Sequence, residues 1–176
     1  GFTIFPSAST VATCQSPDIA YGVAEITAKE LRAVGINMNM APVLDVNSNP
    51  ANPIIGNRAY GDHPSQVCTF GAAIIRGLEN NGIIPCGKHF PGHGDTTTDS
   101  HKALPIVSAT RERLNEIELG PFRYAIQQGL PTIMTAHVHY PALDTETSAT
   151  LSRPILTDLH ILNSTTQILK ITIRGL

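Results

Sequence analysis

The stretch PDIAYGVAEITAKELRAVGINMNMAP, residues 17–42, decides the fold class of this chain. Within residues 17–34 the apolar side chains recur at helical spacing on one face, and charged side chains occupy the other face. Ser16 is suited to cap the start of this helix, and Gly35 is suited to end it. Residues 36–40 then alternate with a period of two, as in a short strand. A helix that leads directly into a strand is therefore expected here.

The same alternation continues along the chain. A second apolar stripe at helical spacing runs over residues 62–82 and is followed by a short apolar strand at 83–87. A third helical region spans 110–128, with an expected break at Gly120, and residues 132–136 are the next strand. Strands separated by amphipathic helices predict an α/β fold built of right-handed βαβ units, with a parallel sheet.

Length and composition restrict the class of protein. The 176 residues correspond to one domain, since domains usually contain about 100–200 residues. Hydrophobic residues make up 41% and charged residues 15%, which excludes an intrinsically disordered chain. A net charge of −2 supplies no field that would hold a polyanion, so neither nucleic acid nor an anionic membrane is expected as a partner.

Targeting and redox signals are weak. No apolar run reaches the ~18 residues of a transmembrane helix, and no signal peptide is recognisable. The compartment stays undetermined, with a lean towards the cytoplasm. Cys14, Cys68 and Cys86 are widely spaced and form no CxxC pair. They predict buried free cysteines and not a disulfide scaffold.

Three long polar loops follow the expected strands, at residues 43–62, 88–108 and 137–150. The connections that leave helices are short by comparison. In parallel α/β folds the functional site lies at the carboxyl ends of the strands. These three loops are therefore the segments in which a site is expected.

The middle loop begins KHFPGHGDTTTDSH, residues 88–101, and contains three of the seven histidines. Asp99 and His101 are two residues apart, so in extended backbone their side chains lie on the same side. A carboxylate beside an imidazole fixes its tautomer and favours the charged ring, which can donate a proton near neutral pH. Lys88 and His89 present hydrogen-bond donors at the strand end.

A metal site is the main alternative for this cluster. Its candidate ligands come from two loops: His89, His93, Asp95, Asp99, His101, His137 and His139. In the first loop, Asp45 and its neighbours are residue types that usually make turns and caps, and Arg58 is as consistent with a solvated charge as with a binding group.

Seven segments together resemble glycoside hydrolase family 3, in its β-N-acetylglucosaminidase branch. They are residues 35–39, 41–46, 49–50, 88–101, 104–105, 134–137 and 149–152. The likeness extends over residues 1–159, and the string at 88–101 is its most specific part.

The resemblance implies a (β/α)8 barrel and a retaining mechanism through a covalent glycosyl-enzyme. It implies that His101 is the general acid/base and that Asp99 orients it. Lys88, His89 and Arg58 would bind the hydroxyl and acetamido groups of the sugar. The implied substrate is a glycan with β-linked N-acetylglucosamine at its non-reducing end, and neither a metal nor a cofactor is implied.

Two departures from the family pattern set further expectations. A (β/α)8 barrel takes about 250 residues, so we expect residues 1–159 to form an incomplete barrel and residues 160–176 a divergent tail. No acidic residue follows Asp158, and neither it nor Asp144 or Glu146 matches the position of the family's nucleophile. The expectation is a chain with the acid/base loop, no nucleophile and little hydrolysis; the alternative is a non-catalytic sugar-binding remnant.

Overall fold

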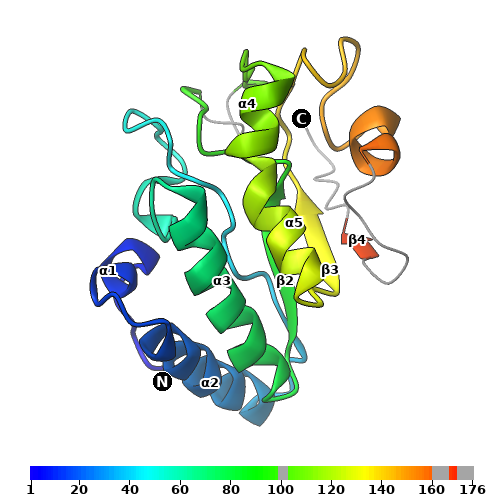
Figure 1. Ribbon diagram of the computed structural model, residues 1–176. Coiled ribbons are helices and arrows are strands. Elements are labelled where there is room, and N and C mark those ends of the chain that lie inside the picture. Colours follow the sequence, from blue (N-terminus) through cyan, green and yellow to red (C-terminus); the bar gives the residue numbers. More distant parts are fainter. Residues whose placement is uncertain (99–102, 160–166, 170–176) are drawn as a thin grey trace.

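A parallel sheet organises the structure, a computed structural model that describes residues 1–98, 103–159 and 167–169 (Figure 1). The strand order is β1-β2-β3-β4, and every neighbouring pair is parallel. The strands are β1 (Met38–Asn39), β2 (Ile84–Phe90), β3 (Thr132–Thr135) and β4 (Gln167–Leu169). Because the spatial order follows the chain order, the described strands are arranged as in a barrel, without the reversal of a doubly wound sheet.

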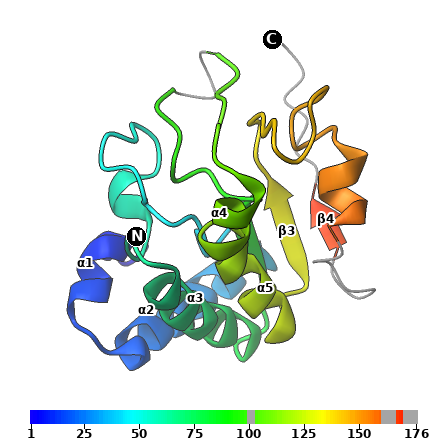
Figure 2. The same ribbon diagram turned by 45° about the horizontal axis from the view of Figure 1, so that its top comes forward.

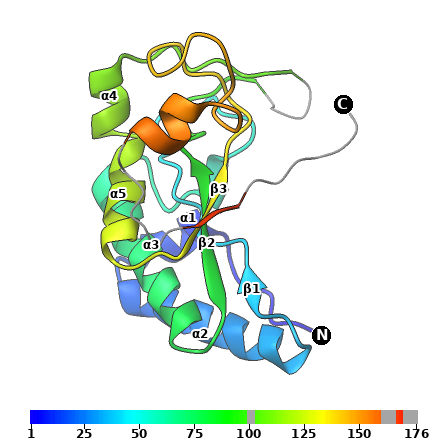
Figure 3. The same cartoon turned by 90° about the vertical axis from the view of Figure 1, so that its right-hand side faces the viewer.

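Two helices precede β1, and the others lie in the connections between the strands. They are α1 (Ala8–Thr13), α2 (Pro17–Ala33), the 3-10 helix η1 (Gly56–Arg58), α3 (Pro64–Glu79), α4 (Arg111–Glu116), α5 (Leu119–Gln127) and the π-helix η2 (Pro154–Asp158). Figure 3 shows α3 and α5 on one side of β2 and β3. The predicted alternation of helices and strands is confirmed. Among the described residues, no helix combines the length and the apolar character needed to cross a bilayer.

Two predicted helices form with nearly the expected limits. In α2 the residues Ala20, Ala24 and Ala28 are buried, so the predicted apolar face is the packed face. Gly35, at φ +81°, follows the helix in the left-handed conformation that glycine adopts without strain. In α3 the buried set includes the whole predicted stripe.

The third helical region is divided earlier than predicted. The break falls at residues 117–118, between α4 and α5, and Pro121 lies in the first turn of α5. Proline is accepted there because the first-turn N–H groups have no partner within the helix. The expected break at Gly120 is therefore wrong by two residues.

Strand β2 is longer than predicted and ends at Phe90, not at Gly87. The register pairs Cys86 with Thr132 and continues to Phe90 with Thr135, past an irregularity. The strand thus carries Lys88 and the residue after it to the carboxyl edge of the sheet. The peptide bonds before Pro42, His89 and Pro91 are cis.

Two hydrophobic clusters hold these elements. The larger lies between the sheet and helices α3, α4 and α5, where the rings of Phe90 and Phe122 meet edge to face at 5.3 Å. The smaller joins α1, α2 and α3. All three cysteines are free; Cys86 is buried as predicted, whereas Cys14 is exposed.

Candidate active site

The three predicted loops meet at the carboxyl edge of the sheet, which comes forward in Figure 2. Hydrogen bonds join them: the side-chain amide of Asn52 donates to the carbonyl of His93 over 2.8 Å. From the third loop, the hydroxyl of Tyr140 donates to the carbonyl of Gly92. The expectation that these segments lie together is confirmed.

Asp45 is the centre of this arrangement, and its side chain is fully buried. One carboxylate oxygen, Oδ2, lies 2.7 Å from Nδ1 of His89, and the other, Oδ1, accepts the backbone N–H of His93 over 2.7 Å. Burial would raise the pKa of Asp45, but the His89 ring and the hydrogen bonds from His89 and His93 outweigh it and lower the pKa below its ordinary value. Asp45 is therefore an ionised carboxylate at neutral pH.

This carboxylate decides the orientation of the His89 ring. An ionised carboxylate can only accept hydrogen bonds, so Nδ1 of His89 carries a proton. The other ring nitrogen, Nε2, has no hydrogen-bond partner within residues 1–98, 103–159 and 167–169. The His89 ring is therefore held in one orientation, with Nε2 able to make a further hydrogen bond.

Lys88, the residue before His89 in β2, is half-buried. Burial and the positive charge of Arg58 lower the pKa of its ammonium group. Arg58, at the end of η1, is exposed, and its Nη1 donates to the carbonyl of Ile54 over 3.1 Å. The charges of Arg58 and Lys88 are therefore close enough to interact, and His89 follows Lys88 in β2. The binding roles of these three residues stay predictions.

His93 has a different place from His89. It is buried, its Nδ1 lies 2.8 Å from the hydroxyl of Thr96, and burial lowers its pKa so that the neutral ring is favoured. The rings of His93 and His89 meet at nearly a right angle, 5.9 Å apart. His93 therefore stabilises the loop by a buried contact with Thr96.

The histidines after β3 are also engaged. Nδ1 of His137 lies 2.9 Å from the hydroxyl of Thr150, and Nε2 of His139 lies 3.0 Å from the carbonyl of Asp144. Among the residues with described positions, no three His, Cys, Asp or Glu side chains are grouped to hold a metal ion. The metal alternative gains no support from these residues, whereas its members Asp99 and His101 lie outside the described part of the chain.

Residues 1–163 match the Glycosyl hydrolase family 3 N terminal domain. The chain belongs to glycosyl hydrolase family 3. The predicted family is confirmed, and the α/β fold of this domain is consistent with a TIM-barrel type.

Three relatives of this family 3 chain show how far the likeness extends. Beta-hexosaminidase A of Pseudoalteromonas piscicida is 48% identical over 123 residues, which are 69% of this chain and 21% of that protein. The family 3 β-N-acetylglucosaminidase of Paenibacillus sp. str. FPU-7 has a TM-score of 0.86 and 48% identity, over 90% of this chain and 30% of that one. NagZ of Neisseria gonorrhoeae, solved with N-trifluoroacetyl-D-glucosamine, has a TM-score of 0.84 and 35% identity, over 90% and 48%. The chain spans less than half the length of each of these relatives.

Asp45 is a candidate site residue of this family 3 chain that the sequence did not predict. Its position directly after the bridge between Val43 and Lys88 puts its carboxylate beside β2. The available signal was a single carboxylate after a strand-like segment, and that signal also fits a turn. The predicted pair Asp99 and His101 falls on residues that the structure does not describe.

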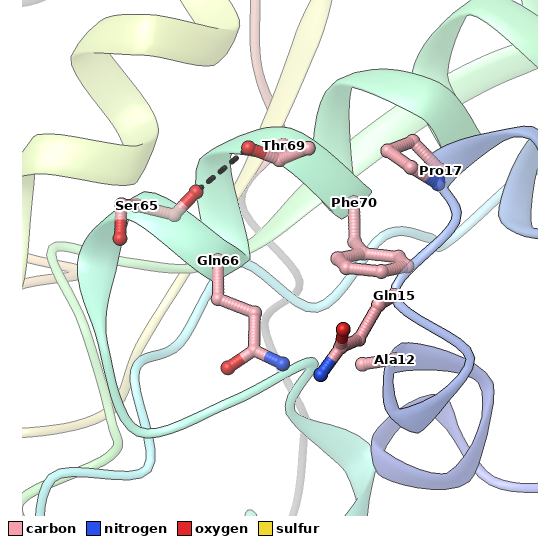
Figure 4. A pocket seen from close by; sticks show the side chains of 7 residues that line it. All are labelled: Ala12, Gln15, Pro17, Ser65, Gln66, Thr69 and Phe70. Atoms are coloured by element: carbon pink, nitrogen blue, oxygen red, sulfur yellow. Dashed lines mark hydrogen bonds between the residues drawn. The ribbon is translucent and has the colours of Figure 1, made fainter.

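A separate hollow of about 290 Å³ lies between the α1–α2 junction and the start of α3 (Figure 4). Phe70 and Pro17 give it apolar walls, and Gln15, Gln66 and Thr69 supply neutral polar groups. It contains no titratable side chain, so it offers no acid–base chemistry of its own.

Proposed function

We propose that this chain is the part of a retaining β-N-acetylhexosaminidase domain that binds the sugar and supplies its acid/base group. The substrate class is a glycan with β-linked N-acetylglucosamine at its non-reducing end. The observation that carries the proposal is the buried Asp45–His89 pair at the carboxyl end of β2, next to Lys88. The names of the relatives, and the N-trifluoroacetyl-D-glucosamine complex of one of them, support the same class.

The binding groups suit a sugar. The ammonium group of Lys88 donates up to three hydrogen bonds, and Nε2 of His89 accepts or donates one, according to its protonation. Sugar hydroxyl groups act as donors and acceptors, so they match both. Because Asp45 holds the His89 ring, the conformational cost of ordering this ring on binding is small.

We further propose that His101, oriented by Asp99, is the acid/base. In a retaining reaction the acid protonates the glycosidic oxygen while a carboxylate attacks the anomeric carbon and forms a glycosyl-enzyme. The same group, now a base, takes a proton from the water that cleaves the glycosyl-enzyme. This step needs a carboxylate nucleophile as the second group.

We propose that none of Asp144, Glu146 and Asp158 is that nucleophile. Hydrogen bonds from the Ser152 side chain and from the N–H groups of Glu146 and Thr147 lower the pKa of Asp144 to about 2, so it serves as a turn former. Asp158 lies in η2, not at a strand end. The proposal therefore includes an incomplete barrel over residues 1–159, a divergent tail at 160–176 and little hydrolysis by the chain alone.

A titration calorimetry experiment with N-acetylglucosamine tests the binding site. The 176-residue chain is expected to bind, and Lys88→Ala or His89→Ala to abolish binding. His63→Ala is the matched control, because that histidine is exposed and its neighbour Asp62 is exposed too. Equal binding by His89→Ala and by the control would refute the site.

Hydrolysis of an aryl β-N-acetylglucosaminide tests the reaction. We expect almost no nitrophenol from the chain alone, since a catalytic unit that lacks one member loses many orders of magnitude in rate. Rapid turnover that disappears in His101→Ala would show that a second carboxylate is present after all. A non-catalytic sugar-binding role is the second candidate, and it predicts binding without turnover in any longer protein that contains this chain.

A further inference from the structure

The junction of α4 and α5 lies directly under the segment that follows β2. Glu118, just before α5, is 1% exposed. A Cβ atom placed on Gly92 would come within 2.7 Å of Cβ of Glu118, and Gly92 has φ +141°, which only glycine adopts readily. The backbone at Gly92 therefore rests on the Glu118 side chain with no space between them.

Arg113 of α4 ties this junction to the same segment. Its Nη1 lies 2.9 Å from Oε1 of Glu118 and 3.2 Å from Oδ2 of Asp95. Nη1 of Arg113 thus bridges the buried carboxylate of Glu118 and the half-buried carboxylate of Asp95, which belongs to the segment after β2. Charge-assisted hydrogen bonds of this kind are about twice as strong as neutral ones.

Several contacts from other segments consequently hold residues 92–95. Tyr140 donates to the carbonyl of Gly92, the N–H of His93 donates to Asp45, and Arg113 binds Asp95. The carboxylate that receives the His93 N–H is the one that orients His89. A shift of this segment therefore changes the bonds available to Asp45 and, through them, the direction of the His89 ring.

We propose that Arg113 and Glu118 are positioning residues of the sugar site, which act through Asp95 and Gly92 to fix the Asp45–His89 pair. The expected effect on sugar affinity rests on the proposed function. The positioning of the Asp45–His89 pair does not. A gain in folding free energy does not explain why Glu118 is buried beside Arg113, because Oε2 of Glu118 has no hydrogen-bond partner among the described residues. Burial of such a group destabilises the folded chain.

The test uses the full 176-residue chain and two measurements. Long-range ¹H–¹⁵N spectra of the His89 ring, assigned with His89→Gln, report the Asp45–His89 pair without any ligand. Calorimetry with N-acetylglucosamine reports the consequence for binding. The variants are Arg113→Met, Arg113→Lys and Asp95→Asn. Arg123→Met is the matched control, because Arg123 also joins α5 to α4, through the carbonyl of Asn115, without touching residues 92–95.

We expect Arg113→Met to shift the His89 ring signals and to weaken sugar binding by about tenfold, whereas Arg123→Met changes neither. Arg113→Lys should keep both near their original values, since a single nitrogen makes the bridge. If Arg113→Met only lowers the unfolding temperature, as the control does, the inference is wrong.

Two further outcomes are decisive. If Arg113→Met does not fold, Asp95→Asn takes its place, and unchanged His89 signals in that variant would overturn the inference. If the unmodified chain binds no sugar, the proposed function fails, while the ring signals still decide whether Arg113 positions His89.

Discussion

At the residue scale, the site depends on a carboxylate that is buried and nevertheless ionised. Asp45 gains at least two strong hydrogen bonds from one segment, and the paired His89 supplies a compensating partner. Without these partners a carboxyl group in this position would be neutral. The pair therefore links the stability of the loop to the orientation of the ligand-binding ring.

Asp45→Asn should demonstrate this link. The variant keeps the size of the side chain but loses the charge and one acceptor oxygen, so we expect a loss of about 3 kcal/mol in the free energy of unfolding. Sugar binding should weaken as well. Denaturant unfolding and calorimetry measure the two effects, and the exposed Asp62→Asn is the control. Similar values for both variants would contradict the assigned role of Asp45.

The stability of the chain should depend on pH through Glu118. Burial, only partly opposed by Arg113, raises the pKa of this carboxyl from 4.5 to about 7. A raised pKa in the folded state means that the folded chain holds the proton more tightly, so the contribution of Glu118 to stability is fully present below about pH 4.5 and is lost as the pH rises towards 7. The shift corresponds to about 3 kcal/mol.

Glu118→Gln removes this titration. The difference in unfolding free energy between the variant and the unmodified chain should therefore grow in favour of the variant between about pH 4.5 and 8, and change little outside that range. Urea unfolding at several pH values measures it. Parallel pH profiles for the two chains would show that Glu118 does not titrate in this range.

At the element scale, the contact between α2 and α3 depends on a small residue. A Cβ atom placed on Gly77 would lie 2.6 Å from Cβ of Ala24 and 2.7 Å from the carbonyl oxygen of Tyr21. We expect Gly77→Ala to destabilise the chain by about 1–3 kcal/mol, because the two helices must move apart. Gly22→Ala in α2 has open space around it and should stabilise by up to about 1 kcal/mol. Thermal unfolding of both variants measures these changes in stability. Equal changes for Gly77→Ala and Gly22→Ala would contradict the close packing at Gly77.

The limits of two helices, α2 and α3, are predictable from local sequence patterns. The limits of α2 and α3 follow from apolar spacing and from the glycine after α2, which are local properties. The break between α4 and α5 does not follow from them. It falls at Glu118, whose position under Gly92 and beside Arg113 is a tertiary contact. A pattern based on proline and glycine places the break two residues too late for that reason.

At the scale of the whole molecule, the sheet has open edges. Among the described strands, β1 and β4 each pair with one neighbour only. Ile36, just before the edge strand β1, and Ile84, at the start of β2, are 43% and 44% exposed. Unpaired edges and exposed apolar residues favour association between chains.

We therefore expect the 176-residue chain to dimerise or aggregate in solution. Sedimentation velocity over a range of concentrations measures this, and Ile36→Lys is the informative variant, because Ile36 precedes the edge strand β1 and a charge at an edge opposes pairing. The association should weaken in that variant. A monomer at all concentrations, for the unmodified chain, would contradict the expectation.

The sequence alone determined the α/β class, the family, and the three loops in which the site lies, since apolar spacing and a long specific motif are properties of consecutive residues. It also identified Lys88, His89 and Arg58 as candidates. Only the tertiary structure decided that Asp45 holds the His89 ring and that Arg113 bridges Glu118 to Asp95. Asp45 and His89 are 44 residues apart, and Arg113 and Asp95 are 18 apart, so these contacts form only when the chain folds. A pattern of consecutive residues cannot predict them.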